Sequence, residues 1–424
     1  MNHIQRVAYF VFGVLLASSG IACNLSFLSS ATTPTPSPIA AIVASTPTVT
    51  VPTVQPVPPT TASTAQPPAV QNNAPQNNAA SFSGAPVILL LDSGKGTMGD
   101  IYKYDVATRS IKQLTTWGYN FPPVVSPNGQ WLAYLSVSQS AVNAIQSGTA
   151  MNAQVYANIW LFNPYTEDAV RIADQPANAS YASGNLIARM TTPVWSPDSS
   201  SVGWIEGNNQ GLRLGIYTLA SKSAATYPLN LPAICCEGAS WGMFWGRSGI
   251  AIMGNEGTFD HTEQVVYVFS PRGERLVRTV LATDTYLEYG WTIDNNNREY
   301  LAGVTNGEFT VVDPFNNGGI AIRGYPELYS INAPNGMAVH QGNDPSVWTV
   351  TRQGQNLTDL TNLTDVRNLS IAPDGSGVLN IQGDYLRGGK LFAVLANGQT
   401  VQITPPARLI TATWGAWVWR IQPQ

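Results

Sequence analysis

The sequence has 424 residues and a formal net charge of −4, and only 11% of its residues are charged, against about 25% in ordinary soluble domains. Hydrophobic residues make up 44%, enough for a sizeable core. The chain has no basic surface on which phosphate contacts could gather, so we expect no nucleic-acid partner. Its three cysteines, Cys23, Cys235 and Cys236, are too few for a disulfide framework and complete no zinc site.

Residues 1–23 have the pattern of an export signal. Arg6 gives a positive start, and the apolar run VAYFVFGVLLASSGIA ends directly before Cys23. The run is marginal for a membrane span but suits a signal peptide. The sequence therefore predicts export.

Gly20, Ile21, Ala22 and Cys23 resemble a bacterial lipobox, in which the cysteine is lipidated and becomes the mature N-terminus. Gly20 departs from that pattern, which prefers an aliphatic residue at this position. The resemblance implies a lipid on Cys23 and a bacterial protein held at a membrane, facing the periplasm or the cell exterior. Cleavage by an ordinary signal peptidase and an uncleaved anchor are open alternatives.

Residues 24–84 read as a linker. The stretch is rich in Pro, Thr, Ala, Gln and Asn, with essentially no charge. Such a composition cannot bury enough apolar surface to offset its ordering entropy, so we expect an extended, disordered stalk. It either spaces a head from the membrane or serves as an inert linker.

Residues 85–424 read as an all-β domain built from a repeat of four strands. Its clearest copies contain PPVVSPNGQWLAYLS, TPVWSPDSSSVGWIE and NLSIAPDGSGVLNIQ. Each copy has a turn in which Pro presets φ and Asn or Asp tolerates the turn conformation. The residues assigned to these turns and their flanks are Pro127, Asn128, Gly129, Trp195, Pro197, Asp198, Pro373, Asp374 and Gly375.

These units resemble the TolB-type propeller repeat, with its W-S-P-D-G turn. The resemblance covers about 340 residues and implies a β-propeller of four-stranded blades. Seven second hairpins, from DIYKYDVATRSIKQLT to KLFAVLANGQTVQIT, predict seven blades, with six as the alternative. We expect the final unit LITATWGAWVWR, which begins near Leu409, to pair beside the first strands and close the ring. The insertion from Val137 to Gln154 should be a protruding loop.

Two motifs suggest chemistry but lack its structural context. Gly94 to Gly99 spells G-x-G-x-x-G, yet the strand-like DIYKYDV follows it where a dinucleotide site needs a helix. Gly238 to Gly242 spells G-x-S-x-G, but no hydrolase domain accompanies Ser240. We interpret both motifs as parts of the propeller's strands and hairpins, and we expect no catalytic residue, metal or cofactor.

Cys235 and Cys236 are adjacent, so outside the cytoplasm they could form a vicinal disulfide. The alternative is two small buried thiols. Twelve Trp and seventeen Tyr lie mostly in predicted strands. We expect most to form the core between blades, and a few exposed at a channel mouth to stack on sugar rings or clamp a peptide.

The sequence thus predicts a monomeric, membrane-tethered, non-catalytic propeller that binds a protein or peptide at one of its faces. The alternative ligand is a carbohydrate or cell-envelope polymer, which low charge and many aromatic residues favour. A propeller-type enzyme is the third hypothesis. Aromatic residues gathered in a groove with amide side chains would favour the glycan.

Overall fold

The computed structural model describes the residues 86–95, 97–147, 156–176, 187–208, 211–231, 242–258, 261–282, 285–293, 298–305, 308–316, 319–323, 329–332, 337–341, 348–352, 355–360, 366–372, 377–382, 390–395, 399–413 and 416–419. Some residues for which the sequence makes predictions lie outside these ranges, and those predictions stay predictions. They are residues 1–23 with Cys23, the linker 24–84, Cys235, Cys236, Ser240, Pro373, Asp374 and Gly375. Within the described ranges, no helix has both the length and the apolar character needed to cross a membrane.

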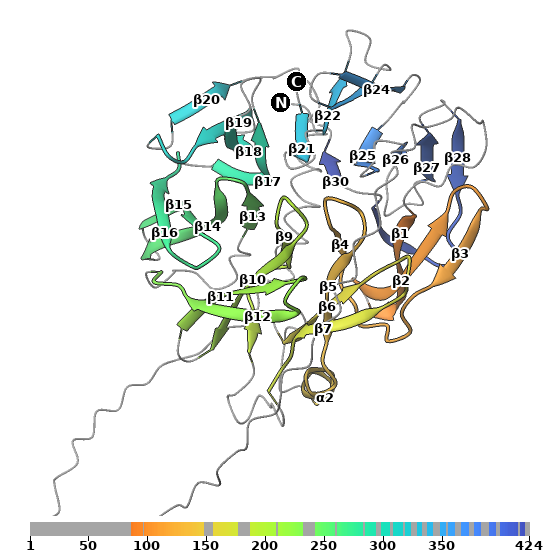
Figure 1. Ribbon diagram of the computed structural model, residues 1–424, viewed down its shortest axis with the longest axis horizontal. Helices are drawn as coiled ribbons and strands as arrows, with labels where there is room; N and C mark the ends of the chain where they lie inside the picture. Colours follow the sequence, from red (N-terminus) through yellow and green to blue (C-terminus); the bar gives the residue numbers. More distant parts are fainter. Residues whose placement is uncertain are drawn as a thin grey trace, which may run out of the picture. The chain divides into compact units, whose positions relative to one another are not determined.

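The described strands form seven antiparallel sheets (Figure 1). The first four sheets contain β1 (Val87–Lys95), β2 (Met98–Asp105) and β3 (Ser110–Gln113); β4 (Val124–Val125), β5 (Leu132–Val137), β6 (Ala157–Phe162) and β7 (Ala169–Ala173); β8 (Ala188–Arg189), β9 (Val194–Trp195), β10 (Ser201–Asn208), β11 (Gly211–Thr218) and β12 (Ser223–Pro228); and β13 (Gly242–Gly246), β14 (Gly249–Thr258), β15 (His261–Phe269) and β16 (Arg275–Val280).

The other three contain β17 (Thr285–Ile293), β18 (Glu299–Thr305), β19 (Glu308–Asp313) and β20 (Gly319–Arg323); β21 (Tyr329–Asn332), β22 (Met337–Gln341), β23 (Trp348–Arg352) and β24 (Gln355–Leu360); and β25 (Val366–Ile371), β26 (Gly377–Gln382), β27 (Lys390–Leu395) and β28 (Thr400–Ile403). The last strands, β29 (Leu409–Thr413) and β30 (Ala416–Trp419), join the first and the seventh sheet.

This topology is that of a β-propeller, and the predicted all-β fold is confirmed. All seven second hairpins form, from β2–β3 to β27–β28. The first strands of neighbouring sheets contact one another in chain order, for example β4 with β9 and β13 with β17. Apolar side chains fill the spaces between sheets, because each strand alternates its side chains between two faces. The number of blades in the closed ring stays a prediction.

The end of the chain pairs with the beginning, as the sequence predicted. In β29, Ala412 lies opposite Leu89 of β1, and the guanidinium of Arg408 contacts the carboxylate of Asp92. Figure 1 shows the blue C-terminal strands beside the orange N-terminal ones. The sequence did not predict that β30 continues into the neighbouring sheet, where Val418 lies opposite Leu369 of β25. The last strands therefore join the first and the last sheets.

The predicted repeat turns form in the two copies that the structure describes. Ser126 Oγ donates to Asn128 Oδ1 at 2.7 Å and accepts from Trp131 N at 3.0 Å. Ser196 repeats this pattern with Asp198 at 2.6 Å and with Ser201 N at 2.9 Å. The hydroxyl and the Asx side chain thus replace backbone partners within a tight turn.

The tryptophans near these turns belong mostly to the core between sheets. Trp195, Trp204 and Trp291 are buried, as expected. The indole Nε1 of Trp195 donates to the carbonyl oxygen of Val124 in the preceding sheet at 3.0 Å, and that of Trp291 donates to Phe244 at 3.2 Å. Each of these two indoles therefore links neighbouring sheets by packing and by one hydrogen bond.

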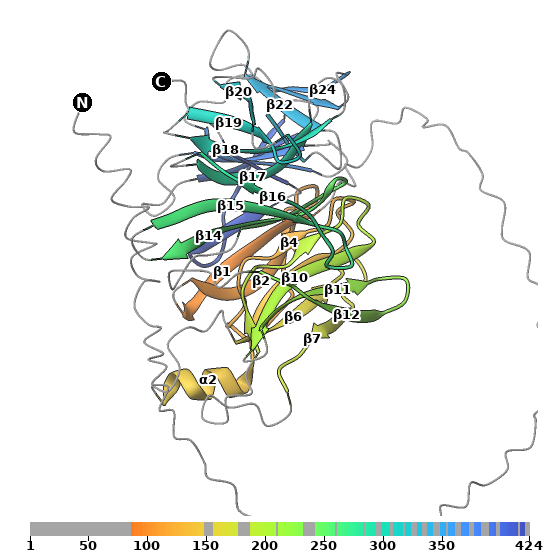
Figure 2. The ribbon, with the colours of Figure 1, turned by 90° about the vertical axis from the view of Figure 1, so that its left-hand side faces the viewer.

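The expectation of a loop from Val137 to Gln154 was wrong in its described part. Helix α2 (Gln139–Gln146) begins there, with Ser138 Oγ accepting from Ala141 N at 3.2 Å as an N-cap (Figure 2). Ala141 and Val142 are buried in a small apolar cluster with Val137. At eight residues the helix is too short for its periodicity to stand out in the sequence.

Candidate functional site

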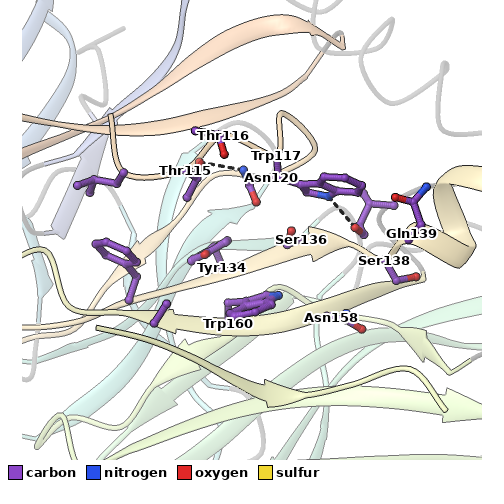
Figure 3. Close-up of a pocket in the computed structure, with 14 residues that line it drawn as sticks. Thr115, Thr116, Trp117, Asn120, Tyr134, Ser136, Ser138, Gln139, Asn158 and Trp160 are labelled. Atoms are coloured by element: carbon purple, nitrogen blue, oxygen red, sulfur yellow. Dashed lines mark hydrogen bonds between the residues drawn. The ribbon is translucent and has the colours of Figure 1, made fainter. Parts of the chain in front are cut away.

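A pocket of about 380 Å³ lies between the first and second sheets (Figure 3). The connection from β3 to β4 supplies one wall, and β5, β6, β7 and the start of α2 supply the others. The lining residues are Leu114, Thr115, Thr116, Trp117, Asn120, Tyr134, Ser136, Val137, Ser138, Gln139, Asn158, Trp160, Phe162 and Ala169. The volume is at the lower end of the roughly 300–1,000 Å³ of small-molecule sites.

The floor of the pocket is one face of the β5–β6 pair. Tyr134 lies opposite Trp160, and Ser136 lies opposite Asn158, so the four side chains share a face by the two-residue period of the strands. Phe162 continues the same face at its far end. The floor therefore alternates aromatic rings with small neutral polar groups.

Three of these polar groups are buried without using their full hydrogen-bonding capacity. Tyr134 is 4% exposed, and Ser136 and Asn158 are each 7% exposed. Asn158 Oδ1 accepts from Gln175 N at 2.9 Å. Among the described residues, we find no partner for the Tyr134 hydroxyl, the Ser136 hydroxyl or the Asn158 Nδ2 group. None of these three atoms is among the fully enclosed, unpartnered side-chain atoms of the described residues, which are Arg213 Nε and the Tyr267 hydroxyl. They are therefore open to the pocket, where a ligand or water can pair with them.

The tyrosine remains a neutral hydroxyl over the whole physiological range. Burial raises the pKa of Tyr134 far above its ordinary value, since the phenolate would lose its hydration. A neutral phenol both donates and accepts a hydrogen bond. Tyr134 can therefore serve either kind of partner in a ligand.

Trp117 forms part of the opposite wall, and its side chain is held in place. Its indole Nε1 donates to the carbonyl oxygen of Val137 at 2.9 Å, and its ring centre lies 5.4 Å from that of Tyr119. The residue is still 38% exposed. Figure 3 shows Trp117 and Trp160 on opposite sides of Ser136. An exposed but fixed aromatic ring loses little entropy when a ligand stacks on it.

The loop that carries Trp117 is organised by Asp100 of β2. Asp100 Oδ1 accepts from Gly118 N at 2.8 Å and from Thr115 Oγ1 at 3.0 Å. Asn120 Nδ2 donates to Thr115 Oγ1 at 3.1 Å and to the carbonyl oxygen of Gly99 at 3.0 Å. The wall is therefore fixed before a ligand arrives.

Gly99, the last glycine of the G-x-G-x-x-G motif, has a structural role beside this loop. It pairs with Asn120 through hydrogen bonds of 3.0 and 3.2 Å. A Cβ at this position would lie 1.8 Å from the carbonyl oxygen of Leu91, so only glycine fits. Strand β2 begins at Met98, and the β1–β2 hairpin takes the place of the helix that a dinucleotide site requires.

No charged side chain is among the described residues that line the pocket. A cation on the same face is Arg171 of β7, opposite Trp160 in register and 5.7 Å from its ring centre. Arg171 pairs with Asp174 at 2.9 Å. Its charge is therefore balanced locally, and the pocket suits an uncharged ligand.

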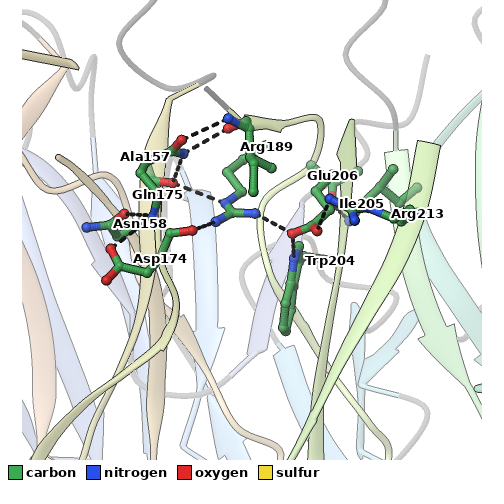
Figure 4. A network of polar contacts seen from close by, with 11 residues as sticks. Ala157, Asn158, Asp174, Gln175, Arg189, Trp204, Ile205, Glu206 and Arg213 are labelled. Carbon is green, nitrogen blue, oxygen red and sulfur yellow. Dashed lines mark hydrogen bonds and ion pairs between the residues drawn. The ribbon is translucent and has the colours of Figure 1, made fainter. Parts of the chain in front are cut away.

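A second polar cluster lies between the second and third sheets (Figure 4). The buried guanidinium of Arg189 pairs with Glu206, and donates to the carbonyl oxygens of Ala157 at 3.1 Å and Asp174 at 2.9 Å. Glu206 also accepts from Trp204 Nε1 at 2.8 Å. Burial lowers the pKa of Arg189 while Glu206 opposes that shift. The cluster is internally satisfied around Arg189, which indicates a structural link between sheets.

The described ranges contain no group of three or more His, Cys, Asp or Glu side chains that could hold a metal ion. The predicted turn residues Pro127, Asn128, Gly129, Pro197 and Asp198 do not contribute to the pocket, and Trp195 lies in the core. These residues form the repeat turns and part of the core between sheets. Sequence reasoning did not find the pocket, since it singled out neither Trp117 nor Trp160.

No protein-family model matches the chain, and no curated protein matches its sequence. Among solved structures, it is similar to TolB from Acinetobacter baumannii, with 13% identity over 79% of this chain and 67% of that one and a TM-score of 0.40. The β-propeller domain of the Trilobed protease from Pyrococcus furiosus has 13% identity, 76% and 95% coverage and a TM-score of 0.46. An oligogalacturonate lyase in complex with manganese has 14% identity, 73% and 70% coverage and a TM-score of 0.35. No functional conclusion follows from these similarities.

Proposed function

We propose that this chain is an exported, membrane-tethered, non-catalytic propeller that binds an uncharged polar ligand in the pocket between its first two sheets. The observation that carries the proposal is the floor of β5–β6, where Tyr134, Ser136 and Asn158 offer unused hydrogen-bonding groups beside aromatic rings. Few polar groups in an aromatic setting are typical of small-ligand sites. The export signal predicted for residues 1–23 supports a site outside the cytoplasm.

The proposal is of binding rather than catalysis because the described pocket lining holds no acid, base or strong nucleophile. General acid–base chemistry needs a titratable group within hydrogen-bonding reach of the reacting atoms. The lining supplies hydroxyls, amides and the phenol of Tyr134. Because burial raises the pKa of Tyr134, this phenol stays un-ionised at neutral pH and cannot act as a general base. A protein or peptide partner at a propeller face stays a prediction.

The test blocks the pocket with a residue that the strand tolerates. Ala169 lies on the exposed outer strand β7, opposite Phe162, so an Ala169→Trp side chain would occupy the pocket. Ala224→Trp on the equivalent strand β12, opposite Tyr217, is the matched control. The full chain is screened by thermal shift against neutral, acidic and basic small molecules and short peptides.

We expect uncharged ligands to raise the melting temperature of the wild type and of Ala224→Trp, but not of Ala169→Trp. Each ligand is recovered after long incubation and analysed by mass spectrometry, and we expect it unchanged. Binding that survives Ala169→Trp would place the site elsewhere. A ligand that is converted by the wild type and intact with Ala169→Trp would show an enzyme.

A further inference from the structure

We infer that the ligand of this pocket is a neutral sugar, with one ring of a glycan stacked against Trp117 or Trp160 and its hydroxyls paired to the β5–β6 floor. This inference rests on the proposed binding function and names its ligand class. Three features of the pocket support this inference: the kind of hydrogen-bonding groups on the floor, the aromatic rings of Trp117 and Trp160, and the lack of charge in the lining.

The floor groups match hydroxyls better than any other common ligand group. Tyr134 and Ser136 each donate and accept, whereas Asn158 offers its Nδ2 donors while its Oδ1 already accepts from Gln175 N. A sugar hydroxyl also donates and accepts, so adjacent hydroxyls can satisfy all three groups together. A proline-rich peptide offers carbonyl acceptors but few donors, and would leave the accepting capacity of Ser136 unused.

Two aromatic rings, Trp117 of the wall and Trp160 of the floor, supply the other half of sugar recognition. A pyranose ring has an apolar face of C–H groups, and such a face packs on an aromatic ring. Trp117 is 38% exposed and Trp160 is half-buried, so each keeps surface for a ligand. Figure 3 shows the small Ser136 between them, and the pocket volume of about 380 Å³ can hold a sugar ring.

The charge pattern narrows the class to neutral sugars. A uronate or a phosphorylated sugar would bring its charge into a lining that offers no cation. Arg171 at the rim already pairs with Asp174 at 2.9 Å. Burying an unpaired carboxylate is far more costly than burying a hydroxyl that finds partners.

The experiment measures binding of neutral oligosaccharides to the full chain. The probes are cellobiose, maltose and N,N′-diacetylchitobiose, followed by an array of neutral glycans. A galacturonate oligomer and a proline-rich peptide are tested as well, because they represent charged sugars and peptides, the two other ligand classes. Isothermal titration gives Kd, and tryptophan fluorescence reports a ligand beside Trp117 or Trp160. We expect at least one neutral glycan to bind and the galacturonate oligomer not to bind.

Tyr134→Phe and Ser136→Ala are the decisive variants because each removes a hydroxyl that has no partner in the described structure. Folding should be unaffected, while the Kd for the glycan should rise roughly three- to tenfold for each, the effect of one net hydrogen bond. Tyr267→Phe makes the same chemical change at a buried tyrosine of the fourth sheet and should leave Kd unchanged. Trp117→Ala should raise Kd at least tenfold.

Two results would overturn the sugar assignment, and they differ in what they mean for the proposed binding function of the pocket. If no neutral glycan binds but the proline-rich peptide binds in a Trp117-dependent way, the pocket is a binding site and the ligand class is wrong. If a glycan binds equally to wild type, Tyr134→Phe and Ala169→Trp, the sugar site lies elsewhere and the assignment of this pocket fails.

Discussion

Arg408 and Asp92 lie 316 residues apart in the chain, yet Arg408 Nε donates to Asp92 Oδ2 at 2.9 Å. Asp92 N also donates to the carbonyl oxygen of Arg408 at 2.8 Å. The pair stands at the beginning of β29, where the C-terminal strand joins β1. Side chain and backbone therefore fasten the two ends of the propeller at the same point.

The side-chain part of this closure should depend on pH. The hydrogen bond from Arg408 and the one from Gly94 N hold the pKa of Asp92 below its usual value. A depressed carboxyl pKa stabilises the fold above the unfolded pKa, and the contribution is lost as pH falls through the folded pKa. Asp92→Asn should therefore lower the melting temperature at pH 7, and the difference from wild type should vanish in strong acid.

A double-mutant cycle with Arg408→Gln isolates the pair. The coupling should be positive at pH 7 and absent at the acid end of the series, measured by thermal unfolding at each pH. Equal coupling at both ends would show that the carboxylate charge does not take part.

A hydrogen bond joins the two repeat turns, and a series of substitutions can measure its contribution to stability. Ser199 is buried with φ of 62°, and its Oγ accepts from Asn128 N of the neighbouring turn at 3.0 Å. Gly129, with φ of 72°, holds the corresponding place in that neighbouring turn. The left-handed conformation costs a non-glycine residue roughly 1–2 kcal/mol, so Ser199 offsets this strain with its hydrogen bond between sheets.

Ser199→Ala keeps the strain and loses the hydrogen bond, so it should lower the free energy of unfolding by about 0.5–1.5 kcal/mol, the net contribution of an ordinary hydrogen bond, because Asn128 is exposed and its N–H can pair with water instead. Ser199→Gly also loses the bond but relieves the strain, and should be the milder of the two. Urea unfolding followed by circular dichroism ranks them. Greater destabilisation by Gly than by Ala would show that the backbone at Ser199 is not strained.

Most of the fold could be predicted from the sequence because the repeat is local. Most second hairpins turn at Pro, Asn or Gly residues, and turn chemistry acts over a few residues. The pairing of β30 with β25 could not be predicted, since Ala416–Trp419 is apolar throughout and fits several sheet edges. The eight residues of α2 carry too few turns for a helical period.

The candidate site was harder to predict because its parts are distant in the chain. Tyr134 and Ser136 look like ordinary members of an apolar strand, and only the register of β5 with β6 sets them opposite Trp160 and Asn158. One signal was available in the sequence: Ser136 and Asn158 are polar residues within otherwise buried strands. Polar residues at such positions need partners, which is a reason to look for a site.

The hydroxyl of Tyr267 provides a test of buried polar groups away from the pocket. Tyr267 is 0% exposed, and its hydroxyl is buried without a partner among the described residues. Tyr267→Phe removes only that hydroxyl and leaves the ring packed with Phe269, 6.0 Å away between ring centres. The free energy of unfolding should rise by about 1 kcal/mol, because an unpaired buried donor costs about 1–3 kcal/mol. A loss of stability in denaturant unfolding would reveal a partner for this hydroxyl.

The Arg189–Glu206 pair should be strongly coupled because both side chains are buried. Arg189→Met would leave the carboxylate of Glu206 with only Trp204 Nε1 and Arg213, which contacts Oε1 at 3.1 Å. Breaking a buried pair from one side typically costs about 3–5 kcal/mol, since an uncompensated charge remains. Because Arg213 still pairs with the Glu206 carboxylate, Arg189→Met should reduce the free energy of unfolding by less than that amount.

Adding Glu206→Gln to Arg189→Met should recover part of the loss. The amide oxygen still accepts from Trp204 Nε1, and no buried carboxylate is left with Arg213 as its one remaining cation. The double variant should thus be more stable than Arg189→Met alone, measured by urea unfolding with tryptophan fluorescence. If the two substitutions were simply additive, the guanidinium and the carboxylate would not depend on each other, and the link between the second and third sheets would rest on apolar packing instead.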